Sequence, residues 1–464
     1  MRFTTFDFVA FFVVVFTSYW LLPRRGQNVL LLAASYVFYG WIHPWFCALI
    51  AFSSVLDYFC GLGMGKHPDR KKTFLWLSLA GNVGMLCVFK YTNFFLDNVR
   101  EVFGTLGLDV GLPVWQVLLP VGISFYTFQT LSYTIDIYRG RMEPRRNLLD
   151  FAVFVSLFPQ LVAGPIERAV RLLPQIETKR TLNFDRIETG VCLIVWGYFK
   201  KLVIADNIAV YVDRIYELPN PAGMVLLAGA FGFLIQVFSD FSAYADIARG
   251  TARLFGFELM RNFNGPHLAS NPSDYWRRWH ISLSTWLRDY IYFPLGGSRA
   301  GPRRFAFAAI ATFGISGLWH GAAWNYVVFG LYHGVLVSVY HLWFQKLGRW
   351  FGKRIGDLPT RIGGIVVVFV LTLIGYLFFR QNDFGRIGTY FTTNPFVNSP
   401  EEIVVGLGII TLGIALCVPM MLRPLALTWA PNNRPMRAVF TWACVGAIFV
   451  LGRETGVDFV YFAF

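Results

Sequence analysis

Residues 305–345 read FAFAAIATFGISGLWHGAAWNYVVFGLYHGVLVSVYHLWFQ, the clearest structural signal in the sequence. The stretch holds two apolar runs, 305–319 and 324–345, and the short connection between them includes His320. Each run approaches the length of about 20 residues that an α-helix needs to cross the apolar core of a bilayer. We therefore predict a membrane-embedded helical hairpin over 305–345, with His320 at its turn.

The same apolar pattern recurs along the rest of the chain. Further candidate spans lie at roughly 6–22, 28–41, 45–64, 74–96, 114–137, 187–212, 222–240, 362–379, 403–422 and 438–452. The first run lacks a basic leader and a cleavage site, so we expect it to stay attached as the first span. Gly and Pro interrupt several runs, which favours broken helices in a packed bundle. We predict an all-α polytopic membrane protein of about 10–12 transmembrane or re-entrant helices, in a single domain over residues 1–464.

The composition excludes a soluble enzyme and a disordered chain. Hydrophobic residues make up 55% of the sequence and charged residues 15%, against roughly 25% charged in an ordinary soluble domain. Lys and Arg number 41 and Asp and Glu 27, a net charge of +14 that in a membrane protein marks cytoplasmic loops rather than a nucleic-acid partner. The basic segments are 24–25, 66–72, 139–146, 168–186, 303–304, 346–354 and the surroundings of Arg423. We expect these segments to face the cytoplasm, the N-terminus to start outside, and 380–402 to form the largest external loop.

Residues 240–300 do not fit a simple span, because charged side chains are mixed with Trp and Tyr. A helix start is predicted at Asn271, since Asn is a good N-cap and a proline follows it. Trp276, Trp279 and Leu283 then share one side of that helix by three- and four-residue spacing. The pattern predicts an amphipathic helix that either anchors the chain at the cytoplasmic interface or dips into the protein.

Two histidines lie in polar and aromatic surroundings beside the membrane core, His280 in WRRWHISLS and His320 in GLWHGAAWN. An ionisable side chain at membrane depth is a functional candidate, and burial keeps an imidazole neutral, as a general base requires. The alternative is a histidine at a helix turn that bonds a backbone carbonyl. His333 stands between Gly330 and Gly334, which favours helix packing. The histidines and the six cysteines show no metal-ligand spacing, and we expect the cysteines to be buried.

Charged side chains also interrupt the apolar runs. The acids are Asp57, Asp136, Asp240 and Asp246, and the bases are Lys200 and Lys201. The acids could form a proton or ion path, but such groups more often pair with an arginine or a hydroxyl and hold a bundle together. The lysines could line the path of an anionic ligand or reach the interface. A rival function is therefore a membrane transporter or polysaccharide-export component that uses the intramembrane acids, and a third is a scaffold that only recruits a partner.

Five longer stretches are together far more specific than any single histidine. They are PVGISFYTFQTLSYTIDIYRG (120–140), LFPQLVAGPIER (157–168), SDYWRRWHISLSTWLRDYIYFPLGGSR (273–299), GLWHGAAWNYVVFGLYHG (317–334) and FVYFAF (459–464). With these motifs the chain resembles the bacterial membrane-bound O-acyltransferases of the alginate O-acetyltransferase type, and more distantly the teichoic-acid D-alanyltransferases. Positions that depart from the family's pattern, and that bear on subfamily and polysaccharide substrate, are Ala243, Ala245, Arg249 and His267.

The resemblance implies a ring of tilted helices around a central funnel, with His320 as the catalytic residue and His280 as a second polar group of the tunnel. Residues 240–300 would be interfacial or re-entrant, and 305–345 would be the catalytic hairpin. The donor would be a cytoplasmic thioester, acetyl-CoA or an acyl-carrier thioester, with no bound cofactor or metal. The acetyl group would cross a bacterial cytoplasmic (inner) membrane to an extracytoplasmic SGNH-type partner and then to a polysaccharide.

The resemblance also implies a role in the reaction for individual residues. Neutral His320 would remove the acceptor's proton, and His280 or an indole N–H would donate to the thioester carbonyl. Arg277, Arg278 and Arg288 suit the phosphates of a CoA-like donor, although contact with anionic lipid is an equal alternative. Further candidates for the channel or the donor site are Trp276, Arg278, Trp279, Trp319, Trp324, Asn325, Asp246 and His333.

Overall fold

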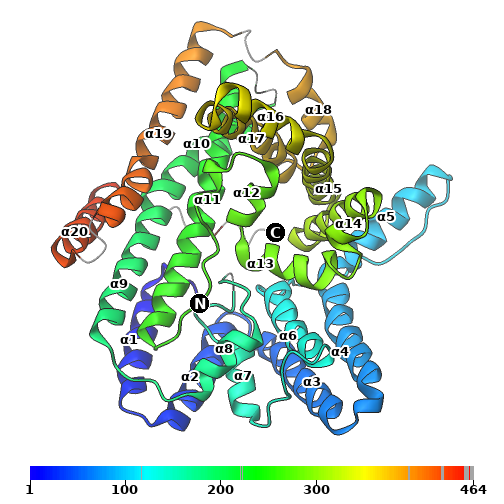
Figure 1. The fold of residues 1–464 in the computed structure, drawn as a ribbon, viewed down its shortest axis with the longest axis vertical. Coiled ribbons are helices and arrows are strands. Elements are labelled where there is room, and N and C mark those ends of the chain that lie inside the picture. The colour runs from blue at the N-terminus through cyan, green and yellow to red at the C-terminus, as the bar shows by residue number, and fades with distance from the viewer. Residues whose placement is uncertain are drawn as a thin grey trace. The chain divides into compact units, whose positions relative to one another are not determined.

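The structure, a computed structural model, describes residues 1–115, 118–162, 164–219, 221, 223–394, 398–429, 433–453 and 459, with side chains described except over 421–429. The side chain of Arg423 and residues 460–464 therefore lie outside the described part. Every regular element within it is a helix, which confirms the predicted all-α class (Figure 1). The chain divides into two compact units: unit 1 is Met1–Val191 with Ala248–Met260, and unit 2 is Cys192–Ile247 with Arg261–Phe464.

Unit 1 is built from the N-terminal helices. Its elements are α1 (Phe6–Trp20), α2 (Arg24–Gly40), α3 (Phe46–Lys66), η1 (Pro68–Arg70), α4 (Lys71–Leu86), η2 (Cys87–Tyr91), α5 (Thr92–Thr105), α6 (Ile123–Tyr138), α7 (Leu148–Ser156) and α8 (Ala169–Glu177). Two helices, α9 (Phe184–Tyr198) and α11 (Gly223–Leu254), have residues in both units. Of the short elements, η1 is a 3-10 helix and η2 a π-helix.

Buried polar side chains join α3, α4 and α6 within unit 1. The fully buried Asp57 carboxylate accepts hydrogen bonds from Ser78 Oγ at 2.6 Å and from Asn82 Nδ2 at 2.9 Å. Ser78 Oγ in turn lies 2.9 Å from Thr134 Oγ1 on α6. In the apolar interior of a helical bundle such bonds satisfy groups that would otherwise be costly to bury. Asp57 therefore has the hydroxyl and amide partners of a bundle-stabilising acid.

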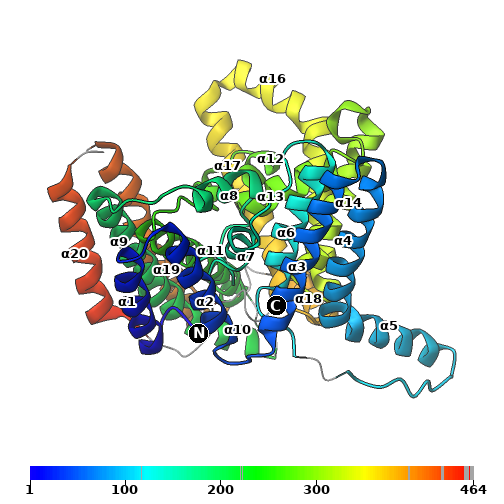
Figure 2. The ribbon, with the colours of Figure 1, turned by 90° about the horizontal axis from the view of Figure 1, so that it is seen from below.

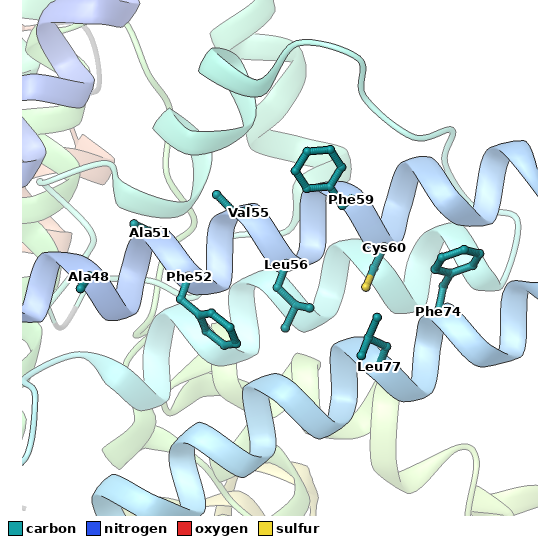
Figure 3. A pocket seen from close by; sticks show the side chains of 9 residues that line it. All are labelled: Ala48, Ala51, Phe52, Val55, Leu56, Phe59, Cys60, Phe74 and Leu77. Atoms are coloured by element: carbon teal, nitrogen blue, oxygen red, sulfur yellow. The ribbon is translucent and has the colours of Figure 1, made fainter.

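An apolar groove of about 520 Å³ lies between α3 and α4 (Figure 3). Its lining is Ala48, Ala51, Phe52, Val55, Leu56, Phe59, Cys60, Phe74 and Leu77. These side chains offer hydrocarbon surface and a single thiol, so the groove suits a lipid chain rather than a reacting group.

The six cysteines are not all buried, contrary to the sequence prediction. Cys60 and Cys444 are buried, Cys87 is exposed, and Cys47, Cys192 and Cys417 are intermediate. An apolar run predicts a membrane environment, and in such a run a side chain can face lipid instead of protein. The apolar run around Cys87 therefore predicted a membrane environment, but it did not predict whether the side chain is buried in the protein.

Unit 2 contains the remaining elements. They are η3 (Phe199–Ala205), α10 (Asp206–Glu217), η4 (Pro266–Leu268), α12 (Pro272–Arg278), α13 (Ile281–Leu287), η5 (Arg288–Tyr292), η6 (Gly297–Arg299), α14 (Pro302–His320), α15 (Trp324–Val339), η7 (Tyr340–Phe344), α16 (Gln345–Ile355), α17 (Asp357–Arg380), α18 (Phe384–Thr392), α19 (Pro400–Trp429) and α20 (Arg434–Leu451). η3, η5 and η7 are π-helices, a form that is often found at functional sites.

Helices α14 and α15 form the predicted hairpin and approach each other unusually closely. A Cβ placed on Gly317 would lie 2.1 Å from the backbone oxygen of Tyr326, and one on Gly330 would lie 2.1 Å from that of Phe313. Only glycine permits such backbone contact between helices. The two glycines therefore fix how α14 and α15 cross.

The membrane character of the chain follows from helix length and composition. Seven described helical segments are long and apolar enough to cross a membrane, and the shorter apolar helix Phe6–Trp20 adds to them. The segments are Phe46–Lys66, Pro68–Thr105, Gly223–Leu254, Trp324–Ile355, Asp357–Arg380, Pro400–Met420 and Arg434–Leu451. The chain is a multi-pass membrane protein.

Helix α11 does not end at residue 240, where the sequence pattern placed the end of a span. It continues to Leu254 through Asp240 and Asp246. Both carboxylates meet lysine ammonium groups in the fold, Asp240 with Lys201 and Asp246 with Lys200. Paired acids can stay inside a helix at membrane depth, so the polar residues did not mark the boundary.

Candidate functional site

His320 is the last residue of α14 and lies at the turn of the hairpin, where the sequence placed it. It is 5% exposed. Its ring centroid lies 5.5 Å from that of Phe379 on α17 and 6.2 Å from that of Phe329 on α15. The close crossing of α14 and α15 therefore holds the imidazole in an aromatic pocket inside unit 2.

His280 interrupts the helix that the sequence predicts after Asn271. The Asn271 side chain caps α12 by accepting from the Asp274 backbone N–H at 2.8 Å, as predicted. The helix then ends at Arg278, and α13 begins only at Ile281. The predicted continuous amphipathic helix is wrong, because His280 adopts a left-handed conformation with φ 42° and ψ 55°. Among the described residues it is the one non-glycine with positive φ.

The left-handed residue places the two histidines side by side. His280 is fully buried, and its ring centroid lies 6.4 Å from that of His320. Trp319 lies beside both rings, at 5.9 Å from His280 and 5.1 Å from His320. Burial holds the pKa of His280, which lies between the candidate spans rather than within them, well below its ordinary value. Backbone strain kept at a buried ionisable residue is typical of functional sites.

A cavity of about 690 Å³ lies within unit 2, and Ile281, the residue after His280, is part of its lining. Its polar and aromatic lining includes Trp276, Arg277, Ser284, Thr285, Arg288, Tyr292, Thr312, Phe313, Tyr340 and His341. Four of these residues belong to the π-helices η5 and η7. The cavity thus combines an apolar wall with hydroxyl and guanidinium groups, the composition of a ligand-binding site.

One face of α14 leads from the cavity to His320. Thr312, Ser316 and His320 are spaced four residues apart, so their side chains follow one another along the helix. Thr312 lines the cavity. The buried Ser316 hydroxyl and the buried Trp276 indole N–H have no hydrogen-bond partner among the residues that the structure describes. Both groups can therefore bond a ligand that enters along this face.

The remaining aromatic candidates form the packing around the site. Trp279 is buried and stacks on Tyr275 at 5.8 Å. His333 packs between Phe329 at 4.7 Å and Trp276 at 5.1 Å. These contacts agree with the packing role that the neighbouring glycines favoured for His333.

Three other candidates lie at the edge of the cavity or away from it. Arg278 donates from Nε to Asp274 Oδ2 at 2.8 Å and is not among the cavity-lining residues, unlike Arg277 and Arg288. Trp324 is 52% exposed at the start of α15. Asn325 is buried and donates from Nδ2 to the Phe378 oxygen at 3.1 Å, which ties α15 to α17.

Asp246 belongs to a separate buried ionic cluster. Lys200 Nζ lies 2.8 Å from Asp246 Oδ2, and Lys201 Nζ lies 2.9 Å from both Asp206 and Asp240. Such contacts match the bundle-stabilising alternative, although the partners are lysines rather than the predicted arginine or hydroxyl. No local pattern indicates the pairs of the lysines with Asp240 and Asp246, since some 40 residues separate these partners in the sequence.

Sequence reasoning missed Tyr292, Tyr340 and His341 as residues of the cavity. No residue pattern marks a π-helix, and His341 had no assigned role. The available signal was the mixture of Tyr, Trp and Arg that follows each apolar or amphipathic helix. Aromatic and cationic side chains together are typical of a membrane interface. This mixture therefore predicts where the residues lie relative to the bilayer, and it does not predict a binding site.

The strained backbone at His280 gives a test that separates geometry from chemistry. His280→Ala and His280→Gly both remove the imidazole, but only glycine adopts positive φ without steric cost. The Gly variant should therefore be more stable than the Ala variant by about 1 kcal/mol, the reverse of the usual helical order. Thermal melting of the two purified variants measures this difference. Equal stability, or a more stable Ala variant, would show that residue 280 is not left-handed.

Known proteins that are similar to this chain are named as acyl-transferring enzymes. A probable alginate O-acetylase of Azotobacter vinelandii is 39% identical over 390 residues, which cover 82% of this chain and 76% of the relative. A peptidoglycan O-acetyltransferase of Helicobacter pylori is 35% identical, over 81% of this chain and 76% of the relative. A teichoic acid D-alanyltransferase of Bacillus subtilis is 30% identical, over 59% of this chain and 71% of the relative.

These relatives, together with the multi-pass membrane character of the chain, define a membrane acyltransferase. The model of MBOAT, the membrane-bound O-acyltransferase family, matches residues 144–379. The chain belongs to the membrane-bound O-acyltransferase family, which confirms the resemblance seen in the motifs.

Proposed function

We propose that this acyltransferase moves an acetyl group from a cytoplasmic thioester, acetyl-CoA or an acyl-carrier thioester, to an extracytoplasmic polysaccharide such as alginate. The route would run through an SGNH-type partner outside a bacterial cytoplasmic membrane. The observation that carries the proposal is the face of α14 on which Thr312, Ser316 and His320 follow one another from the cavity to the histidine pair. The names of the relatives, which refer to alginate and to peptidoglycan, support acetyl transfer to a polysaccharide.

The proposed reaction needs one base and a dry, aligned site. Neutral His320 takes the proton of the acceptor hydroxyl while the hydroxyl oxygen bonds to the acetyl carbonyl carbon. The carbon–sulfur bond then breaks, and the proton passes from His320 to the leaving sulfur, so that an ester and a free thiol result. A positioned base contributes about 10²- to 10⁴-fold to such a step. Alignment of the two reactants in a water-excluded tunnel would supply the remaining rate enhancement.

Groups around His320 would stabilise the charge that develops on the thioester oxygen. His280 and Trp319 both lie against the site, and the indole N–H of Trp276 has hydrogen-bonding capacity left among the described residues. A donor aimed at that oxygen is most effective in a site without water. Arg277 and Arg288 line the cavity, where guanidinium groups would bind the phosphates of a CoA-type donor.

The donor assignment is tested with purified protein in proteoliposomes and labelled acetyl-CoA. Arg288→Gln should raise the KM for acetyl-CoA by about three- to ten-fold with little change in kcat, because it removes a charged contact to phosphate outside the reacting centre. Arg361→Gln, an exposed arginine of α17 in the same unit, is the control with the same charge change. An unchanged KM in Arg288→Gln would contradict phosphate binding at this cavity, and transfer only from an acylated carrier protein would identify the other donor.

A further inference from the structure

Helix α16 is the most cationic helix near the cavity, with no acid between Gln345 and Ile355. Its sequence is QKLGRWFGKRI, and its cations are Lys346, Arg349, Lys353 and Arg354. Its large apolar side chains are Leu347, Trp350, Phe351 and Ile355. This composition is unusual for the connection between two membrane spans.

Three of the four cations lie on a different side of α16 from the apolar side chains. Leu347, Phe351 and Ile355 are spaced four residues apart and form one line along the helix. Lys346, Arg349 and Lys353, spaced three and four apart, form a second line. α16 is therefore amphipathic, and its polar face carries three cations and no acid.

The apolar line is only partly covered by the described chain. Leu347, Phe351 and Ile355 are 42%, 41% and 56% exposed, and α16 has no buried residue. The elements that contact α16 are chiefly η7 and α17, which precede and follow it in the chain. Figure 2 shows α16 in yellow, set apart from α14 and α12 of the same unit.

The exposed apolar surface continues beyond α16. Trp343 and Phe344 of η7 are 64% and 52% exposed. The Arg354 guanidinium lies over the Trp350 ring, 4.5 Å from its centroid. A cation that covers an aromatic ring is the arrangement of side chains at a bilayer interface, where the ring enters the acyl boundary and the charge meets the headgroups.

From these observations we infer that α16 lies on the bilayer surface and binds anionic lipid headgroups through Lys346, Arg349 and Lys353. The chain itself favours lipid over an acidic protein. α16 is the charged end of the 32-residue candidate segment Trp324–Ile355, and only Gly356, at φ 91°, separates it from α17, the next candidate span. A helix tethered so closely to a span stays near the membrane, and its apolar line leaves water only by entering the bilayer. The cations match the negative cytoplasmic leaflet.

Lipid binding at α16 would also fix one wall of the cavity. Gln345, the first residue of α16, lines the cavity together with Tyr340 and His341 of η7. A helix held on the membrane surface therefore positions these side chains. The inference itself rests on exposure, charge and tethering, and it does not require the proposed acetyl transfer.

Hydrogen–deuterium exchange of the full chain in nanodiscs tests lipid binding directly. The two discs contain phosphatidylcholine alone or an equal mixture of phosphatidylcholine and phosphatidylglycerol. Amides of residues 345–355 should exchange about ten-fold more slowly in the anionic disc, because the basic side chains are attracted to the negatively charged surface and hold the helix against it. The triple variant Lys346→Gln, Arg349→Gln, Lys353→Gln should lose this protection, while exchange in α17 stays the same and reports that the fold is intact.

A second triple variant provides the matched control. Arg70→Gln, Lys71→Gln and Lys72→Gln remove the same charge from unit 1 and should leave protection of α16 unchanged. Equal exchange of residues 345–355 in the two discs would overturn the inference. So would protection that survives the α16 substitutions, or that arises in the phosphatidylcholine disc only when an acidic acyl carrier protein is added, since the surface would then bind a protein.

Discussion

His320→Ala should reduce transfer of labelled acetyl by about 10²- to 10⁴-fold in membranes that contain the protein and the proposed SGNH-type partner. The imidazole lies at the end of the α14 face that leads from the cavity, and its removal leaves the acceptor proton without a base. The measurement compares acetyl incorporation from acetyl-CoA at matched protein levels. His280→Ala should also lose activity, because its ring lies against His320.

The matched control is His67→Ala, since His67 is an exposed histidine at the C-cap of α3 in unit 1. Its labelling should equal that of the wild type. Equal labelling by His320→Ala would remove His320 from the chemistry and favour a scaffold that recruits the partner. A loss that appears with substitutions of Asp136 or Asp246 but not of the histidines would favour a transporter.

Lys201→Ala should destabilise the purified protein by about 3–5 kcal/mol, because it removes the cation that lies 2.9 Å from each of two buried carboxylates. The side chains of Lys201, Asp206 and Asp240 are 4%, 6% and 2% exposed, so solvent cannot replace the lost charge. Thermal melting in detergent measures the effect.

Two further variants show whether the loss of stability comes from the unpaired buried charges. A triple variant with Lys201→Met, Asp206→Asn and Asp240→Asn should recover most of the stability, since it removes the charges together. Arg70→Ala breaks the exposed pair with Asp69, whose side chains are 74% and 73% exposed, and should change little. Equal melting of Lys201→Ala and the wild type would show that the cluster is solvated rather than buried.

The parts of the structure that the sequence predicted are those set by local chemistry. The apolar runs predicted helices in a membrane, and the α14–α15 hairpin appears with His320 at its turn. Asn271 caps its helix as expected, because an N-cap depends only on residues within one turn. The motifs predicted the family, since whole stretches of sequence carry far more information than periodicity.

The parts that the sequence could not predict depend on contacts between distant residues or on a single dihedral angle. Helical periodicity continues unbroken through Trp279 and His280, so no pattern shows the left-handed turn that brings His280 against His320. The lysine partners of Asp240 and Asp246 lie on another helix, and the same pairing hides the true end of α11. The resemblance to a family partly makes up for the missing information on distant contacts. It identified both histidines as site residues, but it did not predict the distance between them.

The glycine crossing of α14 and α15 also bears on how enzymes of this kind can change their acceptor. The backbones of the hairpin touch at Gly317 and Gly330, so a larger residue at either position would clash with the opposite helix. Diversification of substrate range must then occur in the surrounding helices, which can exchange side chains while the hairpin keeps its shape. Directed evolution of substrate range should accordingly leave Gly317 and Gly330 fixed and randomise side chains of the helices around the hairpin instead.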